Sequence, residues 1–174
     1  QQKLDIPPEL LLHIPFMVDI KEICSKNFPP FDARNGFISI GNGKHAPNVD
    51  SLKVLKKEIW PRIRLHLPEA EIQIFGAYLP QQINEMHDSQ TGFYIKGWTE
   101  NATIAFQKAK VLLAPLQFGA GIKGKLLDGM RTGTPSVTTT IGAEGMHAGL
   151  AWNGTIADDW DTFAHAAVEL HQNK

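Results

Sequence analysis

Residues 111–141 constrain the fold more than any other part of the chain. They begin with an apolar run at 111–116, which is typical of a buried strand, and end with a β-branched run at 136–141. Between the two runs lies FGAGIKGKLLDGMRTGTP, residues 118–135, in which a glycine-rich segment leads into a helical pattern. A strand, a glycine loop, a helix and a second strand make a βαβ unit, so we expect the two strands to be parallel.

The helix of this unit has its apolar residues at i, i+4 and i+8, which are Ile122, Leu126 and Met130. Gly133 and Pro135 are typical signals for its end. We therefore expect a helix that starts close to Ile122 and stops before Gly133.

The start of this helix suits a phosphate-type ligand. Helix N-termini expose unpaired N–H groups and partial positive charge. Here the glycines at 119, 121 and 124 lie at the start, and Lys123 and Lys125 add positive charge. Glycine-rich turns also occur in α/β domains that bind no ligand, so that alternative stays open at this point.

Strands and helical segments alternate along the chain. The expected strands are 37–41, 71–76, 93–97, 111–116, 136–140 and 155–157. Four further helices are expected. The first begins at Asn48 or Asp50 and kinks or ends at Pro61, and the second covers 80–86. The third runs from Thr99 through Lys108, and the fourth begins at Asp158 or Asp159. This alternation predicts an α/β fold, with a doubly wound parallel sheet of about six strands and helices on both faces.

Ligands of such sheets bind beyond the carboxyl ends of the strands. The loops that follow the expected strands are 41–47, 76–80, 97–99, 117–122 and 141–146. We therefore expect these loops to share one rim of the sheet.

The composition is that of a globular domain and excludes several classes of protein. Of the 174 residues, 43% are hydrophobic and 20% are charged, and the net charge is −1, so nucleic acid is not an expected partner. Cys24 is the only cysteine, which excludes an internal disulfide and a cysteine zinc cluster. No apolar run approaches the ~20 residues of a membrane span, and the start shows no signal-peptide pattern.

Residues 1–35 differ from the rest of the chain. Their prolines fall at 7, 8, 15, 29 and 30, and their apolar runs are interrupted. We expect a linker or the trailing edge of a missing N-terminal domain, with one short strand near 14–18. Residues 36–174 are then the folded domain.

Two nucleotide-binding patterns fit the sequence only in part. Residues 41–46, GNGKHA, match G-x-G-x-x-G/A, but Pro47 interrupts the helix that should follow, and no acidic residue closes the second strand. Residues 119–125 approach the P-loop pattern, but Leu126 replaces the serine or threonine that would bind magnesium. An NAD-dependent oxidoreductase and a magnesium-dependent NTPase are therefore weaker interpretations.

A longer block carries a closer match. Residues 114–130, APLQFGAGIKGKLLDGM, followed by GTPSV at 133–137 and GAEG at 142–145, resemble the donor-binding half of a GT-B fold glycosyltransferase of the retaining family 4, or group 1. The resemblance covers about residues 36–172. It implies a Rossmann-like domain that binds a UDP- or GDP-linked sugar without a cofactor and without a metal.

The resemblance also assigns roles to residues. The family's motif has two glutamates. The second matches Asp128, which would hold the ribose. The first matches Ala120, where a sugar contact is lost or made by the backbone. The family's basic pair after the first strand is absent, and Asn42 and Asn48 stand near those places.

The candidate ligand-binding residues are therefore Gly41, Lys44, Trp98, Gly119, Ala120, Gly121, Ile122, Lys123, Lys125 and Asp128. Among them the three lysines are candidates for the diphosphate, and Trp98 lies where the family seats the base. Glu144 and His45 are weaker candidates, and no catalytic residue is assigned.

The resemblance implies one part of a hexosyltransferase-type enzyme of glycan or surface polysaccharide biosynthesis. A missing N-terminal domain would bind the glycan or lipid-linked acceptor, so we expect the chain alone to be inactive. The expected location is the cytoplasm, or the inner face of a membrane through the missing domain. The alternative is a non-catalytic nucleotide-sugar-binding or interaction domain, which Ala120 and the absent basic pair favour.

Overall fold

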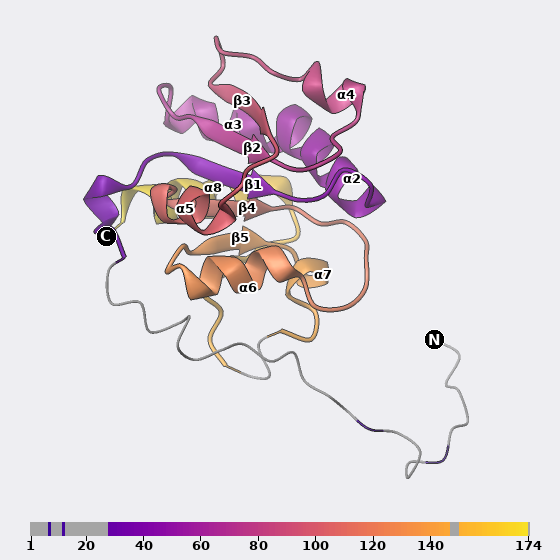
Figure 1. The fold of residues 1–174 in the computed structure, drawn as a ribbon. Helices are drawn as coiled ribbons and strands as arrows, with labels where there is room; N and C mark the ends of the chain where they lie inside the picture. The colour runs from indigo at the N-terminus through magenta and orange to yellow at the C-terminus, as the bar shows by residue number, and fades with distance from the viewer. Residues whose placement is uncertain (1–6, 8–11, 13–27, 147–149, 174) are drawn as a thin grey trace.

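The computed structural model describes residues 28–146 and 150–173, together with the single residues 7 and 12. Its centre is one sheet of six strands, all paired in parallel, in the order β3-β2-β1-β4-β5-β6. The strands are β1 (Phe37–Ile40), β2 (Ile72–Phe75), β3 (Phe93–Gly97), β4 (Val111–Ala114), β5 (Ser136–Thr138) and β6 (Gly154–Ile156) (Figure 1). The expected doubly wound sheet is confirmed. The strand expected near 14–18 lies outside the described residues.

Helical segments connect these strands. They are η2 (Phe31–Ala33), α2 (Ala46–Val54), η3 (Leu55–Ile59), α3 (Trp60–His66), α4 (Gln81–Asn84), α5 (Ala102–Lys108), α6 (Gly124–Arg131), α7 (Thr140–Ala143) and α8 (Trp160–Gln172). Within the described part of the chain, no helix is long and apolar enough to cross a membrane.

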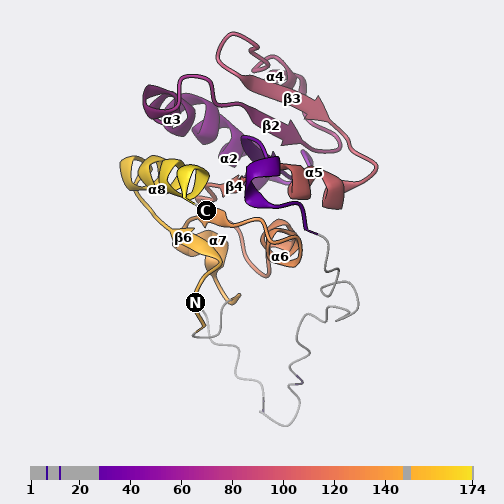
Figure 2. The ribbon, with the colours of Figure 1, turned by 90° about the vertical axis from the view of Figure 1, so that its left-hand side faces the viewer.

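The central strands β1, β4 and β5 bury residues on both of their faces, because helices lie on both sides of the sheet (Figure 2). Phe37 and Ile38 of β1 point to opposite faces and belong to two separate core clusters. The first cluster packs β1 against α2, η3, α3 and α8, and the second packs it against α5 and α6. The near-continuous apolar strands of the sequence therefore reflect two covered faces.

The N-caps of α2 and α5 differ from the sequence-based expectation. The N-cap of α2 is His45, without a side-chain cap, so the prediction of Asn48 or Asp50 was wrong. Pro47 stands in the first turn of α2, where its missing N–H costs nothing. The N-cap of α5 is Asn101, whose side chain accepts from the Ile104 N–H, so the prediction of Thr99 was also wrong.

Pro61 does not end its helix. The segment η3, directly before α3, is a π-helix, in which the N–H of Trp60 bonds to the carbonyl of Leu55. Proline lacks an N–H and its ring crowds the preceding turn. One widened π-turn accommodates both effects, and the chain then continues as α3.

Strand β5 ends earlier than expected. Thr139 is the N-cap of α7, because its Oγ1 accepts from the Gly142 N–H and donates to the Leu116 carbonyl. The interpretation of 138–140 as strand was therefore wrong beyond Thr138. A similar correction applies to α6, which starts at Gly124 and leaves Ile122 in the preceding loop.

The expected end of α6 before Gly133 is confirmed, and it takes the form of a Schellman turn. Gly133 has a φ of +63°, its N–H bonds to the Met130 carbonyl, and the Thr134 N–H bonds to the Gly129 carbonyl. The expected start of α8 at Asp159 is also confirmed, because this carboxylate accepts from the N–H groups of Asp161 and Thr162.

Candidate functional site

A pocket of about 640 Å³ lies at the carboxyl ends of β1 and β4. These two strands are neighbours in the sheet, and the chain leaves them in opposite directions, toward β2 and toward β5. The lining residues come from the segments after the two strands. They are Ile40, Gly41, Asn42, His45, Pro47 and Asn48 on one side, and Leu116, Gly119, Ala120, Ile122, Lys123, Gly124, Lys125 and Asp128 on the other. This is the switch point where open α/β sheets bind ligands.

The glycine loop between β4 and α6 requires its glycines. Gly119 has a φ of +125° and Gly121 has a φ of +75°, which side-chain-bearing residues rarely adopt. Lys123 closes the loop, because its Nζ donates to the Gly121 carbonyl at 2.6 Å. The loop thereby keeps its backbone close to the pocket and brings a lysine to the first turn of α6.

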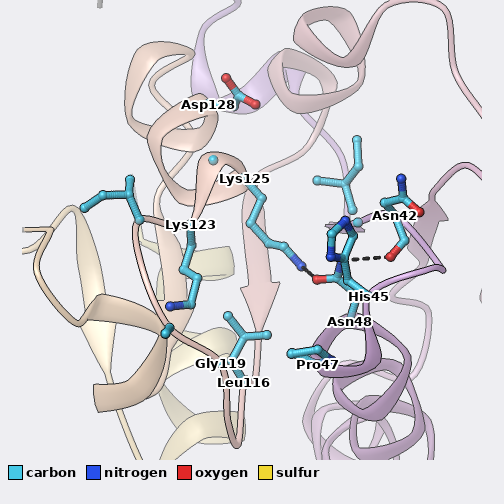
Figure 3. A pocket seen from close by; sticks show the side chains of 14 residues that line it. Asn42, His45, Pro47, Asn48, Leu116, Gly119, Lys123, Lys125 and Asp128 are labelled. Atoms are coloured by element: carbon cyan, nitrogen blue, oxygen red, sulfur yellow. Dashed lines mark hydrogen bonds between the residues drawn. The ribbon is translucent and has the colours of Figure 1, made fainter. Parts of the chain in front are cut away.

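A chain of two hydrogen bonds crosses the pocket (Figure 3). Lys125 Nζ donates to Oδ1 of Asn48 at 2.7 Å, and Nδ2 of Asn48 donates to the Asn42 carbonyl at 2.9 Å. Gly41 lies against this amide, since a Cβ at that position would come within 2.6 to 2.8 Å of the Asn48 side chain. Polar side chains thus join the segments after β1 and β4.

Lys125 is the most perturbed cation of the pocket. Its side chain is partly buried, and among the described residues it forms no ion pair with a carboxylate. Burial, followed by the charge of Lys123, lowers the pKa of Lys125 to about 8. A half-buried ammonium whose acceptor is a neutral amide can gain most from an anionic ligand.

Asp128 is the acidic residue that lines the pocket. It lies one turn after Lys125 on α6 (Figure 3). Its carboxylate accepts from Nη1 of Arg131 at 3.3 Å. Its side chain is 45% exposed, so solvent and a ligand can both reach it.

The structure brings most of the candidate residues together. Seven of the ten line the pocket, namely Gly41, Gly119, Ala120, Ile122, Lys123, Lys125 and Asp128. The other three do not line it. Lys44 places its Nζ 4.0 Å from the centre of the Tyr78 ring, Trp98 is 69% exposed after β3, and Gly121 shapes the loop through its backbone. Their binding roles stay predictions.

Sequence reasoning missed part of the lining. His45 is only a weaker candidate from the sequence, yet it lines the pocket beside Pro47 and Asn48. The available signal was Pro47, which marks the start of α2 and therefore places its neighbours at the carboxyl end of β1. Glu144 lies apart, in a separate cavity of about 330 Å³ beside Thr140.

The arrangement is suited to binding an anionic ligand. Lysines at the start of α6, free loop backbone and neutral amides can hold an anion, and a carboxylate can hold hydroxyl groups. In the described ranges, no three His, Cys, Asp or Glu side chains gather as metal ligands would.

Residues 34–173 match the family described as glycosyl transferases group 1. No curated protein sequence matches the chain significantly.

Three solved structures illustrate the fold. A mutant of TarM from S. aureus, in a complex that includes UDP, has a TM-score of 0.59 at 15% identity over 80% of this chain and 29% of that chain. A UDP-forming trehalose-phosphate synthase from Burkholderia xenovorans has a TM-score of 0.56 at 11% identity, over 83% of this chain and 38% of that chain. WaaG, described as a glycosyltransferase involved in lipopolysaccharide biosynthesis, has a TM-score of 0.58 at 14% identity, over 97% of this chain and 54% of that chain. The chain therefore spans about half or less of the length of these proteins, and the Rossmann-like half of the GT-B fold is confirmed.

Proposed function

The chain belongs to the glycosyl transferases group 1 family, and from that premise we propose that it is the donor-binding domain of a retaining glycosyltransferase. The ligand of the pocket between β1 and β4 is then a nucleotide sugar, held mainly through its diphosphate. The whole enzyme transfers the sugar of this donor to an acceptor.

The observation that carries this proposal is the position of Lys125. Its partly buried ammonium lies at the switch point of the sheet, beside the glycine loop, and it bonds to a neutral amide instead of a carboxylate. A diphosphate supplies the missing negative charge, and the backbone N–H groups at the start of α6 supply further donors. Lys123 can add a further donor once its Nζ breaks its hydrogen bond to the Gly121 carbonyl.

Asp128 holds the ribose in this proposal. A carboxylate accepts two hydrogen bonds from vicinal hydroxyls, and Asp128 lines the pocket one turn after Lys125 on α6. The base is UDP- or GDP-type. UDP is the first choice because a structurally similar TarM crystal contains it and a similar trehalose-phosphate synthase is UDP-forming. No metal and no cofactor is needed, because the lysines neutralise the diphosphate.

The acceptor belongs to a second domain in this proposal. Residues 1–35 are the connection to that N-terminal domain, and residues 36–174 are the donor domain. The acceptor is a glycan or a lipid-linked sugar of surface polysaccharide biosynthesis, a class that the similarity to WaaG supports. The chain alone transfers no sugar, because it cannot hold both reactants in contact. The whole protein works in the cytoplasm or at the inner face of a membrane.

A second candidate function is a non-catalytic domain that binds nucleotide sugars. It is favoured by Ala120, which lines the pocket at the place of the family's first glutamate. Asn42 and Asn48 at the places of the basic pair favour it as well. The two candidates share the ligand and differ in turnover by the full-length protein.

A thermal-shift panel tests the shared part. UDP, GDP and ADP should be compared with their nucleosides and with UDP- and GDP-linked sugars, because a ligand that binds only the folded state raises the midpoint. One nucleoside diphosphate and its sugars should raise the midpoint, while the bare nucleosides do so much less. A panel in which no nucleotide raises the midpoint would overturn both candidate functions. Sugar transfer by the full-length protein, with none by residues 1–174, then separates the two.

A further inference from the structure

We propose that Asn48 is a positioning residue, whose side-chain amide holds the Lys125 ammonium at the place where the diphosphate binds. This inference rests on the proposed function and adds a second element to the anion site. Helix α6 supplies the lysine, and the first turn of α2 supplies the group that aims it.

The amide of Asn48 is oriented by its other hydrogen bond. Its Nδ2 donates to the Asn42 carbonyl at 2.9 Å, which leaves Oδ1 facing across the pocket toward Lys125 Nζ at 2.7 Å (Figure 3). Rotating the amide by half a turn would oppose donor to donor and acceptor to acceptor, so one orientation is selected. Gly41 leaves room for this amide, because a Cβ there would collide with it.

The other lysines near the pocket are directed elsewhere. Lys44 lies over the Tyr78 ring, and Lys123 bonds to the Gly121 carbonyl of its own loop. Lys125 is the lysine that spans from α6 to α2. Its position therefore depends on Asn48 more than on its own helix, since a lysine side chain has many rotamers.

The charge of Lys125 is sensitive to what surrounds it. The titratable groups that line the pocket with it are Lys123 at the N-cap of α6, Asp128 of α6, and His45 from the loop after β1. Asp50 of α2 accepts from Gln117 instead. Since the pKa of Lys125 is lowered to about 8, a diphosphate that favours the ammonium must bind more weakly as pH rises through about 8.

Asn48 sets the pH at which this weakening begins. Asn48→Ala removes the acceptor of the ammonium, so the pKa of Lys125 should fall further and the weakening should begin at lower pH. Asn48→Asp places a carboxylate against the ammonium, so the pKa should rise and the weakening should move to higher pH. The aspartate also neutralises the ammonium, so it should reduce diphosphate affinity at neutral pH.

A control variant comes from a second link between the same two segments. Gln117 Nε2 donates to Oδ2 of Asp50 at 2.9 Å, which ties the loop after β4 to α2 outside the pocket. Gln117→Ala breaks this link without touching Lys125. If Asn48 served only to tie the two segments together, Gln117→Ala and Asn48→Ala would have the same effects.

The experiment is calorimetric titration with UDP and with uridine, and with GDP and guanosine if the panel selects them. It should run from about pH 7 to about pH 9, above the second ionisation of a phosphate near pH 6. Asn48→Ala should weaken UDP roughly tenfold, in line with the loss of one charged hydrogen bond, and leave uridine unchanged. The pH profiles of Asn48→Ala and Asn48→Asp should shift in opposite directions, and Gln117→Ala should match the parent protein.

Each outcome decides the inference. If UDP binds the parent, but Asn48→Ala and Asn48→Asp keep the parental pH profile, Asn48 is no positioning residue and the inference alone is overturned. If Gln117→Ala reproduces the profile of Asn48→Ala, the link is merely structural. If neither nucleoside diphosphate binds the parent, the proposed function fails and takes the inference with it. Circular dichroism should verify the fold of each variant first.

Discussion

Nη1 of Arg34 donates to the Gly133 carbonyl at 2.8 Å, across 99 residues of sequence. Gly133 ends α6, so the segment before β1 fixes the far end of the helix whose first turn carries Lys125. Other nitrogens of the same guanidinium donate to the carbonyls of Thr132 and Pro29. Helix α6 is therefore held at both ends by side chains that reach the residues around β1.

Arg34→Met should destabilise the domain. The side chain is 7% exposed, and its removal takes a donor from the buried Thr132 carbonyl and from the part-buried Gly133 carbonyl. We expect a loss of about 2 to 3 kcal/mol in the free energy of unfolding, measured in urea. Arg64→Met is the control, because Arg64 donates one part-buried bond, to the Ala70 carbonyl, and should cost about 1 kcal/mol or less. Equal losses in the two variants would contradict the proposed anchoring of α6.

Lys125→Met should stabilise the protein near neutral pH while it weakens diphosphate binding. The folded pKa of Lys125, about 8, lies below the ordinary value of 10.5, so between these values the unfolded chain binds more protons. The free energy of unfolding therefore rises with pH in this window, and below about pH 8 the cost of the buried charge is fully present. Methionine removes that cost, which we put at about 1 to 2 kcal/mol.

Urea unfolding of the parent and Lys125→Met at about pH 7 and about pH 9.5 checks this expectation. The advantage of the variant should shrink at the higher pH, because the parental lysine is then largely neutral. Lys44→Met is the control, because Lys44 lies over the Tyr78 ring and the lowered pKa of Lys125 comes from burial and from Lys123. A destabilisation by Lys125→Met that is the same at both pH values would contradict the expectation.

The sheet was predictable because its information is local. Apolar runs such as 111–116 and the helical spacing between them are properties of single segments, and strand β4 appears where the run predicts it. The ends of elements were less predictable. Thr139 has a β-branched side chain that favours a strand, yet its hydroxyl caps α7, and only the position of the Leu116 carbonyl decides between the two.

The same distinction explains the candidate site. Lys123, Lys125 and the glycines belong to one continuous segment, so their association could be read from the sequence. His45 and Asn48 enter the pocket because β1 and β4 are neighbours in the sheet, although they lie far apart in the chain. No local pattern contains that pairing, and the orientation of the Asn48 amide depends on it.

Gly121→Ala should disturb the glycine loop although there is room for the added methyl group. No heavy atom lies within 4 Å of a Cβ at this position, but φ is +75°, so the cost is backbone strain of about 1 kcal/mol. Gly124→Ala is the matched control, since a Cβ there also has no heavy atom within 4 Å. Gly124 is the first residue of α6, and its φ is not positive. Nucleoside diphosphate binding should weaken in Gly121→Ala and persist in Gly124→Ala. Equal binding by both variants would show that the loop conformation is not needed.

Asp128→Asn and Lys125→Met should leave different signatures on the same ligand pair. If Asp128 holds the ribose, Asp128→Asn weakens uridine and UDP by similar amounts, because both carry the ribose. If Lys125 holds the diphosphate, Lys125→Met weakens UDP by about 1 to 3 kcal/mol and leaves uridine nearly unchanged. Added salt should reduce the lysine effect, since it screens a charge–charge interaction.

Asp128 also pairs with Arg131 at 3.3 Å, so Arg131→Gln is the control for loss of that pair, and it should bind uridine like the parent. Calorimetry on the three variants measures these differences. If Asp128→Asn and Lys125→Met both bind UDP like the parent, the nucleotide does not bind in this pocket, and the rim around Tyr78 and Trp98 is the next place to test.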